Sequence, residues 1–445
     1  MSGIFIFRRD YRIEDNLSLY ELGKVCKTIY PVFIFTPEQI QKNSYFSSNS
    51  FQFLMESLKE LDSTLKHKLN IYFGENEKVI DSILKKYSDI QYVAYNRDYT
   101  PYAKSRDKKI EKVCKKHDIE IISKDDYTIH PMSEMRDGSY FSVFKPFYEK
   151  VMKMKTPKLL PAPSKVSYKS ISNLSLKKFE KYYTPNKNVI VHGGRKNAQK
   201  ILRNISKFKN YAKTRDIPTK PTTLLSAYIK YGCVSIREVY VTMIKKLGKR
   251  NELIRQVVWH DFYANMMNFL PSKNTVGGGN YKNKKVKWIS NKRWLDKWMK
   301  GKTGFPIIDA FMRQLNTTGW MQNRGRLLVS NFLTFVLHQN WRLGEKYFAR
   351  QLVDYDVTSN NMNWQFSAGV GTDRTPYVRI YNPWKQSLDI DKDCKFIKEW
   401  IPELKDVENK YIHHWYKYYE EIDSKYTKPI VDFDKERKIG LKQIK

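Results

Sequence analysis

Short apolar runs alternate with amphipathic stretches through the first 125 residues. The apolar runs are rich in β-branched and aromatic residues, as strands are, and they lie at 3–7, 29–35, 70–74, 90–96 and 119–123. Between them, segments such as 51–68 and 102–118 carry apolar residues at the three- and four-residue spacing of helices. Near-continuous apolar strands that alternate with helices predict an α/β fold with a parallel, doubly wound sheet. No GxGxxG follows the first strand, so an ordinary dinucleotide site is not supported there.

The pattern changes after a stretch rich in Pro, Ser and Lys that lacks a sustained period and is interpreted as a long connector. From 193–205 onward, long segments such as 252–270 and 326–341 are apolar on a wide face, as buried helices are, and no obvious strand is found. We therefore predict three parts: an α/β domain at 1–131, an interdomain linker at 132–195 and an all-helical domain at 196–445.

The amino-acid composition indicates that the protein is folded and strongly basic. Hydrophobic residues make up 41% of the 445 positions and aromatic residues 14%, which excludes a disordered chain. The chain has 81 Lys and Arg against 46 Asp and Glu, a formal net charge of +35 that would attract a polyanion such as nucleic acid or an acidic membrane. A lysine bias can also reflect the base composition of a gene, but the charge favours a nucleic-acid partner. The stretch 277–288 is interpreted as a basic surface loop.

The four cysteines lie far apart in the sequence, at Cys26, Cys114, Cys233 and Cys394. This spacing predicts neither a zinc site nor a disulfide framework, so no metal is expected. No apolar run approaches the length of a membrane span. A soluble, intracellular protein without membrane association is expected.

Two groups of polar residues in the helical half have both a structural and a functional interpretation. Thr222, Thr223 and Ser226 precede a predicted helix, where they could cap its free N–H groups or hold a phosphate. Arg326 and Asp354 could form a buried ion pair kept for positioning.

A third group lies on one predicted helix. Gln256, Trp259 and Tyr263 fall at i, i+3 and i+7 and so share a face. That face is either ordinary core with a satisfied glutamine or an amide beside aromatic walls that could receive a base.

Several long motifs, taken together, resemble the photolyase/cryptochrome family. They run from the first predicted strand nearly to the end of the chain, in order: "FRRDYRIEDN", "NRDYTPYAKSRD", "LSAYIKYGCVS", "GKTGFPIIDAFMRQLNTTGWMQNRGRL", "DYDVTSNNMNWQ" and "PYVRIYNP". The resemblance is greatest to class I cyclobutane pyrimidine dimer photolyases. It implies an α/β antenna domain and a helical domain that binds flavin adenine dinucleotide (FAD).

The resemblance also implies roles for individual residues. The phosphates of FAD would be held by Tyr211 and by the loop Thr222, Thr223, Leu224, Leu225 and Ser226. The rest of the flavin pocket would comprise Trp320, Asn323, Arg326, Asp354, Asp356 and Asn360. Asn360 matches the residue that faces flavin N5, where an uncharged amide would avoid a nearby carboxylate that competes for the proton.

Three tryptophans match the family's electron route to the flavin. Trp364 is the innermost, followed by Trp341 and, outermost, Trp288. Each alone is ordinary core, and the interpretation depends on all three falling in register. An antenna chromophore of folate or deazaflavin type is also implied, but the residues at 30–130 do not identify it.

The implied activity is light-driven repair of UV-damaged DNA by a monomeric enzyme. Contacts to the DNA and its lesion would come from Arg215, Gln256, Trp259, Tyr263, Asn323 and Arg324. In 6-4 photolyases two histidines stand where this chain has Asn323 and Leu327, and neither residue here can donate a proton by titrating. That favours cyclobutane dimers, although Gln256 stands where class I enzymes usually carry Glu and 6-4 enzymes carry Gln.

Other departures from the family pattern affect only pocket packing: Leu253, His260, Gln322 and Phe366. Two other functions stay open. A cryptochrome would share the fold and flavin but signal through a partner, often with a tail that the sequence does not show after 440. A basic nucleic-acid binder without catalysis would lack flavin.

Overall fold

The computed structural model describes residues 1–135, 141–172, 174–271, 273, 275–276, 286–371 and 379–443. The predicted basic loop at 277–288 lies outside them as far as residue 285. The described chain forms two compact units, of which the first comprises 1–185, 191–209 and 223–270, and the second 186–190, 210–222 and 271–445.

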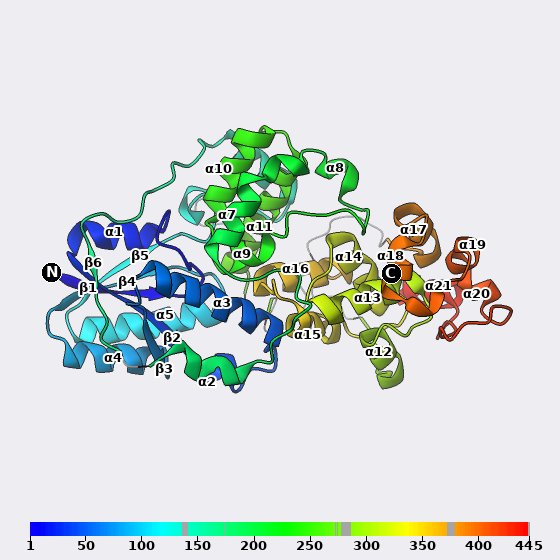
Figure 1. Ribbon diagram of the computed structural model, residues 1–445, viewed down its shortest axis with the longest axis horizontal. Coiled ribbons are helices and arrows are strands. Elements are labelled where there is room, and N and C mark those ends of the chain that lie inside the picture. The colour runs from blue at the N-terminus through cyan, green and yellow to red at the C-terminus, as the bar shows by residue number, and fades with distance from the viewer. Residues whose placement is uncertain are drawn as a thin grey trace. The chain divides into compact units, whose positions relative to one another are not determined.

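The first unit is built on a parallel sheet of strand order β3-β2-β1-β4-β5, with β6 paired to β2 (Figure 1). The strands are β1 (Ser2–Phe7), β2 (Thr28–Phe35), β3 (Asn70–Phe73), β4 (Ile90–Asn96), β5 (Glu120–Lys124) and β6 (Ser167–Tyr168). The α/β fold class is therefore confirmed, and the five predicted strands are found within a residue or so of their expected bounds.

Helices connect the strands and cover the sheet. They are α1 (Leu17–Val25), α2 (Pro37–Ile40), α3 (Ser48–Thr64), α4 (Asn76–Lys86) and α5 (Pro101–Lys116). Ile4 and Ile6 of β1 share a buried cluster with Ile80 of α4 and Ile110 of α5, whereas Phe5 and Phe7 alternate with them along the strand. Both sets are buried, which explains why the strand is continuously apolar.

The expected connector carries regular structure of its own. The structure places α6 (Phe144–Lys153) and β6 within it, so the absence of a sustained period did not mean absence of a helix. Four later helices belong to the same compact unit: α7 (Arg195–Arg203), α9 (Ser226–Lys230), α10 (Ile236–Leu247) and α11 (Glu252–Phe269).

A buried cluster of charges ties α10 to the sheet. Asp126, which follows β5, accepts hydrogen bonds from Arg12 at 2.5 Å and from Arg237 of α10 at 2.7 Å. Arg237 also donates to Asp15 at 3.1 Å. All four side chains are at most 5% exposed. Because a buried charge is costly unless it is paired, this cluster holds the three segments in one arrangement.

The second unit is built of helices joined by loops, and its described residues include no strand. Its helices are α8 (Tyr211–Thr214), α12 (Lys292–Met299), α13 (Pro306–Thr318), α14 (Asn323–Phe335), α15 (Trp341–Gln351), α16 (Val357–Ser367), α17 (Pro383–Ile390), α18 (Lys395–Trp400), α19 (Asn409–His413), α20 (Trp415–Tyr418) and α21 (Phe433–Gln443). The apolar stretch 326–341 is not one helix: it ends at Phe335, and α15 starts afresh after Asn340, whose side chain caps it. None of the described helices has the length and apolar character to cross a membrane.

Candidate functional site

The predicted ion pair in the second unit is present at the start of α14. Nη2 of Arg326 donates to both carboxylate oxygens of Asp354, at 3.0 and 2.9 Å. Its Nε donates to the carbonyl of Met321 at 2.7 Å, so the guanidinium is fixed by two partners. Asp354 is 6% exposed, and the pair orders the residues that lead into α16.

Helix α16 begins at a predicted site residue. The carboxylate of Asp356 accepts a hydrogen bond from the backbone N–H of Ser359 at 2.8 Å and thereby caps the helix. One turn later, the amide of Asn360 donates to Glu345 of α15, at 3.1 Å to its Oε1 and 3.2 Å to its carbonyl. Glu345 is 3% exposed. The amide of Asn360 is therefore held by a buried carboxylate of the neighbouring helix.

Two buried side chains near these residues have polar groups suited to a polar ligand. Gln322 is 3% exposed, and in the part of the chain that the structure describes neither its amide nitrogen nor its amide oxygen finds a partner. The hydroxyl of Thr358, in the first turn of α16, is likewise buried without one. Since a buried polar group without a partner costs free energy, these residues suit a site that a polar molecule completes.

The three predicted tryptophans differ in exposure. Trp364 and Trp341 are 3% and 1% exposed and belong to one core cluster, whereas Trp288 is partly exposed and packs against that cluster. Backbone pairing of Ile289 with Gln339 brings the chain next to Trp288 close to the start of α15. A Cβ on Gly344 would lie 2.1 Å from the Trp364 ring, so glycine allows the indole to pack on α15.

The predicted DNA contacts of the second unit gather around one carboxylate. Asp216 accepts a hydrogen bond from Arg324 at 2.6 Å, and Nε of Arg215 lies 3.9 Å from its other oxygen. The Arg215 guanidinium also lies 5.6 Å from the ring centre of Tyr211. Asn323 is exposed at the first position of α14, and Trp320 is half-buried just before it.

The predicted phosphate loop is divided between the units, with Thr222 in the second and residues 223–226 in the first. The residue before α9 is Leu225, which makes no side-chain capping bond, but its backbone N–H donates to the Thr223 hydroxyl at 3.5 Å. Leu224 is left-handed, with φ of 54°. Ser226 is exposed at the first position of α9.

Helix α11 carries the predicted amide and aromatic face in the first unit. Gln256 and Trp259 are half-buried, and Tyr263 is 7% exposed with its ring centre 5.5 Å from that of Trp259. The Gln256 amide donates to Oε1 of Glu252 at 3.1 Å. Because a carboxylate can only accept, this bond fixes which end of the amide faces Glu252.

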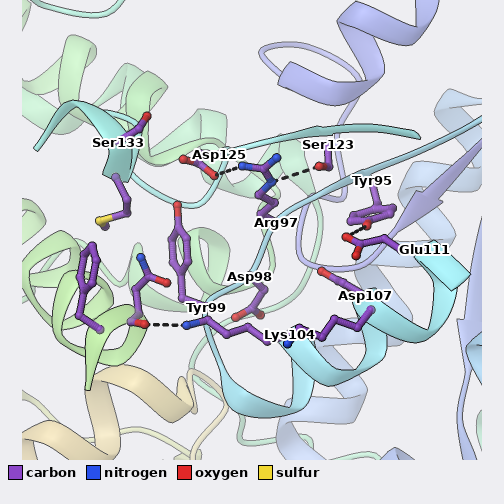
Figure 2. Close-up of a pocket in the computed structure, with 14 residues that line it drawn as sticks. Tyr95, Arg97, Asp98, Tyr99, Lys104, Asp107, Glu111, Ser123, Asp125 and Ser133 are labelled. Carbon is purple, nitrogen blue, oxygen red and sulfur yellow. Dashed lines mark hydrogen bonds and ion pairs between the residues drawn. The ribbon is translucent and has the colours of Figure 1, made fainter. Parts of the chain in front are cut away.

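A pocket of about 620 Å³ lies in the first unit, where β4 and β5 end (Figure 2). Its walls combine aromatic rings, lysines and carboxylates: Tyr95, Tyr99, Phe269, Lys104, Lys108, Asp98, Asp107, Glu111 and Asp125. Tyr95 donates to Glu111 at 3.2 Å, and Lys104 donates to the carbonyl of Asn268 at 2.6 Å. Burial lowers the pKa of Lys104, and the neighbouring charge of Lys108 adds to that shift.

Sequence comparisons assign both parts of the chain to one family. Residues 4–164 match the DNA photolyase family, and residues 253–445 match the FAD binding domain of DNA photolyase. The deoxyribodipyrimidine photo-lyase of Buchnera aphidicola from Acyrthosiphon pisum is 33% identical, over 99% of this chain and 96% of the relative. That of Escherichia coli is 30% identical, over 97% and 96%. The chain belongs to the DNA photolyase family.

Solved structures agree with this assignment. The archaeal photolyase from Sulfolobus tokodaii, which contains two FAD molecules, superposes with a TM-score of 0.89 at 35% identity, covering 100% of this chain and 99% of that one. A cryptochrome from Synechocystis superposes with a TM-score of 0.90 at 24% identity, covering 99% of each chain, which shows the shared fold alone.

FAD is the cofactor of this family's helical domain. The residues present suit it, because the Gln322 amide and the Thr358 hydroxyl are buried without partners beside carboxylates and an arginine that are already fixed. In the sequence, Gln322 stands out only as a departure from the family pattern, and nothing there singles out Glu345 or Glu252. The sequence around an acidic residue of a helix does not indicate which amide group its side chain will contact.

Proposed function

We propose that this protein is a deoxyribodipyrimidine photolyase that splits cyclobutane pyrimidine dimers in UV-damaged DNA under light. When bound, reduced FAD supplies the chemistry by lending one electron to the dimer and taking it back after the two bonds between the bases break. The chain's own residues bind and orient the flavin and the lesion. The relatives named above are deoxyribodipyrimidine photo-lyases matched over nearly their full length, and this observation carries the proposal.

The test uses oligonucleotides that bear either a cyclobutane dimer or a 6-4 photoproduct. Reduced protein is incubated with each, in light and in dark, and lesion loss is followed by chromatography. Loss of the cyclobutane dimer in light alone supports the proposal. Light-dependent loss of the 6-4 product alone would show that Gln256, and not Asn323 and Leu327, indicates the lesion.

For FAD, we propose that the carboxylates of Asp354 and Asp356 and the amide of Asn360 bind the flavin and ribityl groups. Arg326 orients Asp354 through the observed double hydrogen bond. Trp320 and Asn323 complete this part of the pocket, and Tyr211 with the loop 222–226 binds the phosphates. Glu345 orients the Asn360 amide by accepting its hydrogen bond at 3.1 Å.

For the lesion, we propose that Gln256 donates to a thymine carbonyl while Trp259 and Tyr263 form the aromatic wall. Arg215, Asn323 and Arg324 contact the damaged strand. In duplex DNA the dimer must leave the base stack to reach such a site, as it does in photolyases generally.

Gln256→Glu is expected to make lesion binding depend on pH. The new carboxyl would stand at hydrogen-bond distance from Glu252, and two like charges so close raise the pKa of the pair. The protonated pair can still donate to the lesion, so affinity falls as pH rises through the raised pKa. Binding to a cyclobutane-dimer oligonucleotide at pH 6 and pH 8 measures this. The double variant Glu252→Gln with Gln256→Glu should lose the dependence; an equally steep dependence there would contradict the pairing.

Arg215→Ala is expected to weaken the binding of damaged and undamaged DNA to the same extent, because a phosphate contact carries no information about the lesion. The slope of log affinity against log salt should fall by about one unit. Lys405→Ala, which removes an exposed lysine after α18, is the control and should leave the slope unchanged. If the salt dependence of Arg215→Ala equals that of the wild type, this arginine does not contact a phosphate and its interactions are those with Asp216 and Tyr211.

We further propose that the pocket in Figure 2 holds the antenna chromophore, of folate or deazaflavin type. Tyr95, Tyr99 and Phe269 suit a planar ring, and Lys104 with Lys108 suits a negatively charged arm. Chromatography of the cofactors released from purified protein identifies the molecule. A second flavin, as in the Sulfolobus tokodaii photolyase, would overturn the predicted type.

The cryptochrome alternative predicts flavin without light-dependent lesion loss. The alternative of a basic DNA-binding protein predicts a colourless preparation. The monomeric state stays a prediction that light scattering tests.

A further inference from the structure

The indole of Trp259 is covered on one face by a second aromatic ring. Phe144 of α6 lies parallel to it, with ring centres 3.6 Å apart and an angle of 2° between the planes. Phe144 is 8% exposed, so the stack is part of the packing between α6 and α11. Phe144 lies in the segment 132–195, which was predicted from the sequence to be a connector.

A third ring fixes the tilt of this pair. Phe262 stands at 86° to both planes, with its centre 5.4 Å from that of Trp259 and 5.7 Å from that of Phe144. Turning the indole out of its plane would drive it into one ring or away from the other. The orientation of Trp259 is therefore set by the surrounding aromatic side chains before any DNA arrives.

The stack also limits how a base can bind. Bases stack on aromatic side chains face to face, at about the separation found between Phe144 and Trp259. Phe144 thus takes the place that a base would take on that side, and Trp259 keeps a single face for stacking. Intercalation of the indole between two bases is excluded, and one pyrimidine at a time can lie on it.

We propose that Phe144 is a positioning residue of the lesion site, which fixes the plane of Trp259 and leaves one face of it for a flipped pyrimidine. This inference rests on the lesion-binding role proposed for Trp259. Replacing Phe144 by a non-planar side chain leaves the indole free to tilt, so that part of the stacking with the lesion is lost. Binding of undamaged duplex, which keeps its bases stacked in the helix, does not use this face.

The experiment measures dissociation constants for one duplex with and without a single cyclobutane dimer. Phe144→Leu is expected to bind the damaged duplex about tenfold more weakly. This loss corresponds to part of the free energy that stacking of a base on an aromatic side chain provides. Affinity for undamaged duplex stays as in the wild type. Phe144→Tyr keeps the planar ring and should retain the preference for the lesion. Phe144→Met, which keeps apolar bulk without a ring, replaces the leucine variant if that variant does not fold.

Phe147→Leu is the matched control. Phe147 lies in the same helix, is fully buried, and makes edge contacts to Phe141 and Phe262. Its loss should lower the melting temperature as much as Phe144→Leu does while the preference for the lesion remains. An unchanged preference in Phe144→Leu, or an equal loss in Phe147→Leu, overturns the inference. If the wild type itself shows no preference for the dimer, the proposed function fails instead, which separates the two failures.

Discussion

Trp364→Phe is expected to abolish light-driven reduction of the bound flavin while leaving lesion repair by chemically reduced protein intact. A phenyl ring is much harder to oxidise than an indole, so the rate should fall at least about a hundredfold, which corresponds to ~3 kcal/mol of barrier. The side chain is 3% exposed and packs edge-on against Phe348, with ring centres 5.0 Å apart. Phenylalanine keeps most of that contact, and the smaller ring should cost about 1–2 kcal/mol of stability.

The measurement is flavin absorbance during illumination in the presence of a reductant. Trp298 provides a matched control, because its indole is fully buried and also contacts Trp364, with ring centres 6.2 Å apart. It is not on the proposed route through Trp341 and Trp288. Trp298→Phe should therefore still photoreduce. Full photoreduction in Trp364→Phe, or its loss in Trp298→Phe, would show that electrons reach the flavin another way.

Asp126→Ala is expected to lower the free energy of unfolding of the first unit by about 3–5 kcal/mol, because two buried guanidinium groups lose their carboxylate. The partners are Arg12 and Arg237, at 2.5 and 2.7 Å. Urea denaturation followed by circular dichroism measures the change. Glu21→Gln, which breaks only an exposed pair with Lys24, is the control and should leave the curve unchanged. Equal curves for both variants would mean that the cluster adds little.

The same carboxylate contributes to acid stability. Burial by itself would raise the pKa of Asp126, but Arg12 and Arg237 outweigh burial and hold that pKa below its ordinary value. Such a group stabilises the fold above its unfolded pKa of about 4, and this stability is lost as pH falls through the folded pKa. Asp126→Asn should therefore lose less stability than the wild type between pH 4 and the acid end of the titration.

Period explains what the sequence could predict. The strands could be predicted because an apolar run and the amphipathic helices beside it are visible within a short stretch of sequence. The site motifs could be recognised because the residues of each motif are consecutive in the chain. Helix α6 was missed although Phe144, Phe147 and Val151 keep a helical spacing, because the segment 132–195 is rich in Pro, Ser and Lys and shows no sustained period. Pro146 stands in the first turn of this helix. Proline in a first turn costs no backbone hydrogen bond.

Contacts between distant segments leave no such trace. Nothing in the sequence around Arg12 indicates that its partner is Asp126, or that Arg237 completes the pair. The Asn360 contact with Glu345 crosses from one helix to the next, and the stack of Phe144 on Trp259 joins residues 115 positions apart. These contacts required the three-dimensional structure.

The cluster of Arg12, Asp15, Asp126 and Arg237 has a consequence for synthesis on the ribosome. All five strands of the main sheet precede residue 125, yet Arg237, which pairs both aspartates, leaves the ribosome on the order of ten seconds after Asp126 at ordinary elongation rates. During that interval Asp15 lacks the guanidinium partner that it has in the folded protein. The sheet, although first in the chain, therefore waits for a later helix before it becomes a finished fold, and chaperones that shield nascent chains have that interval in which to act.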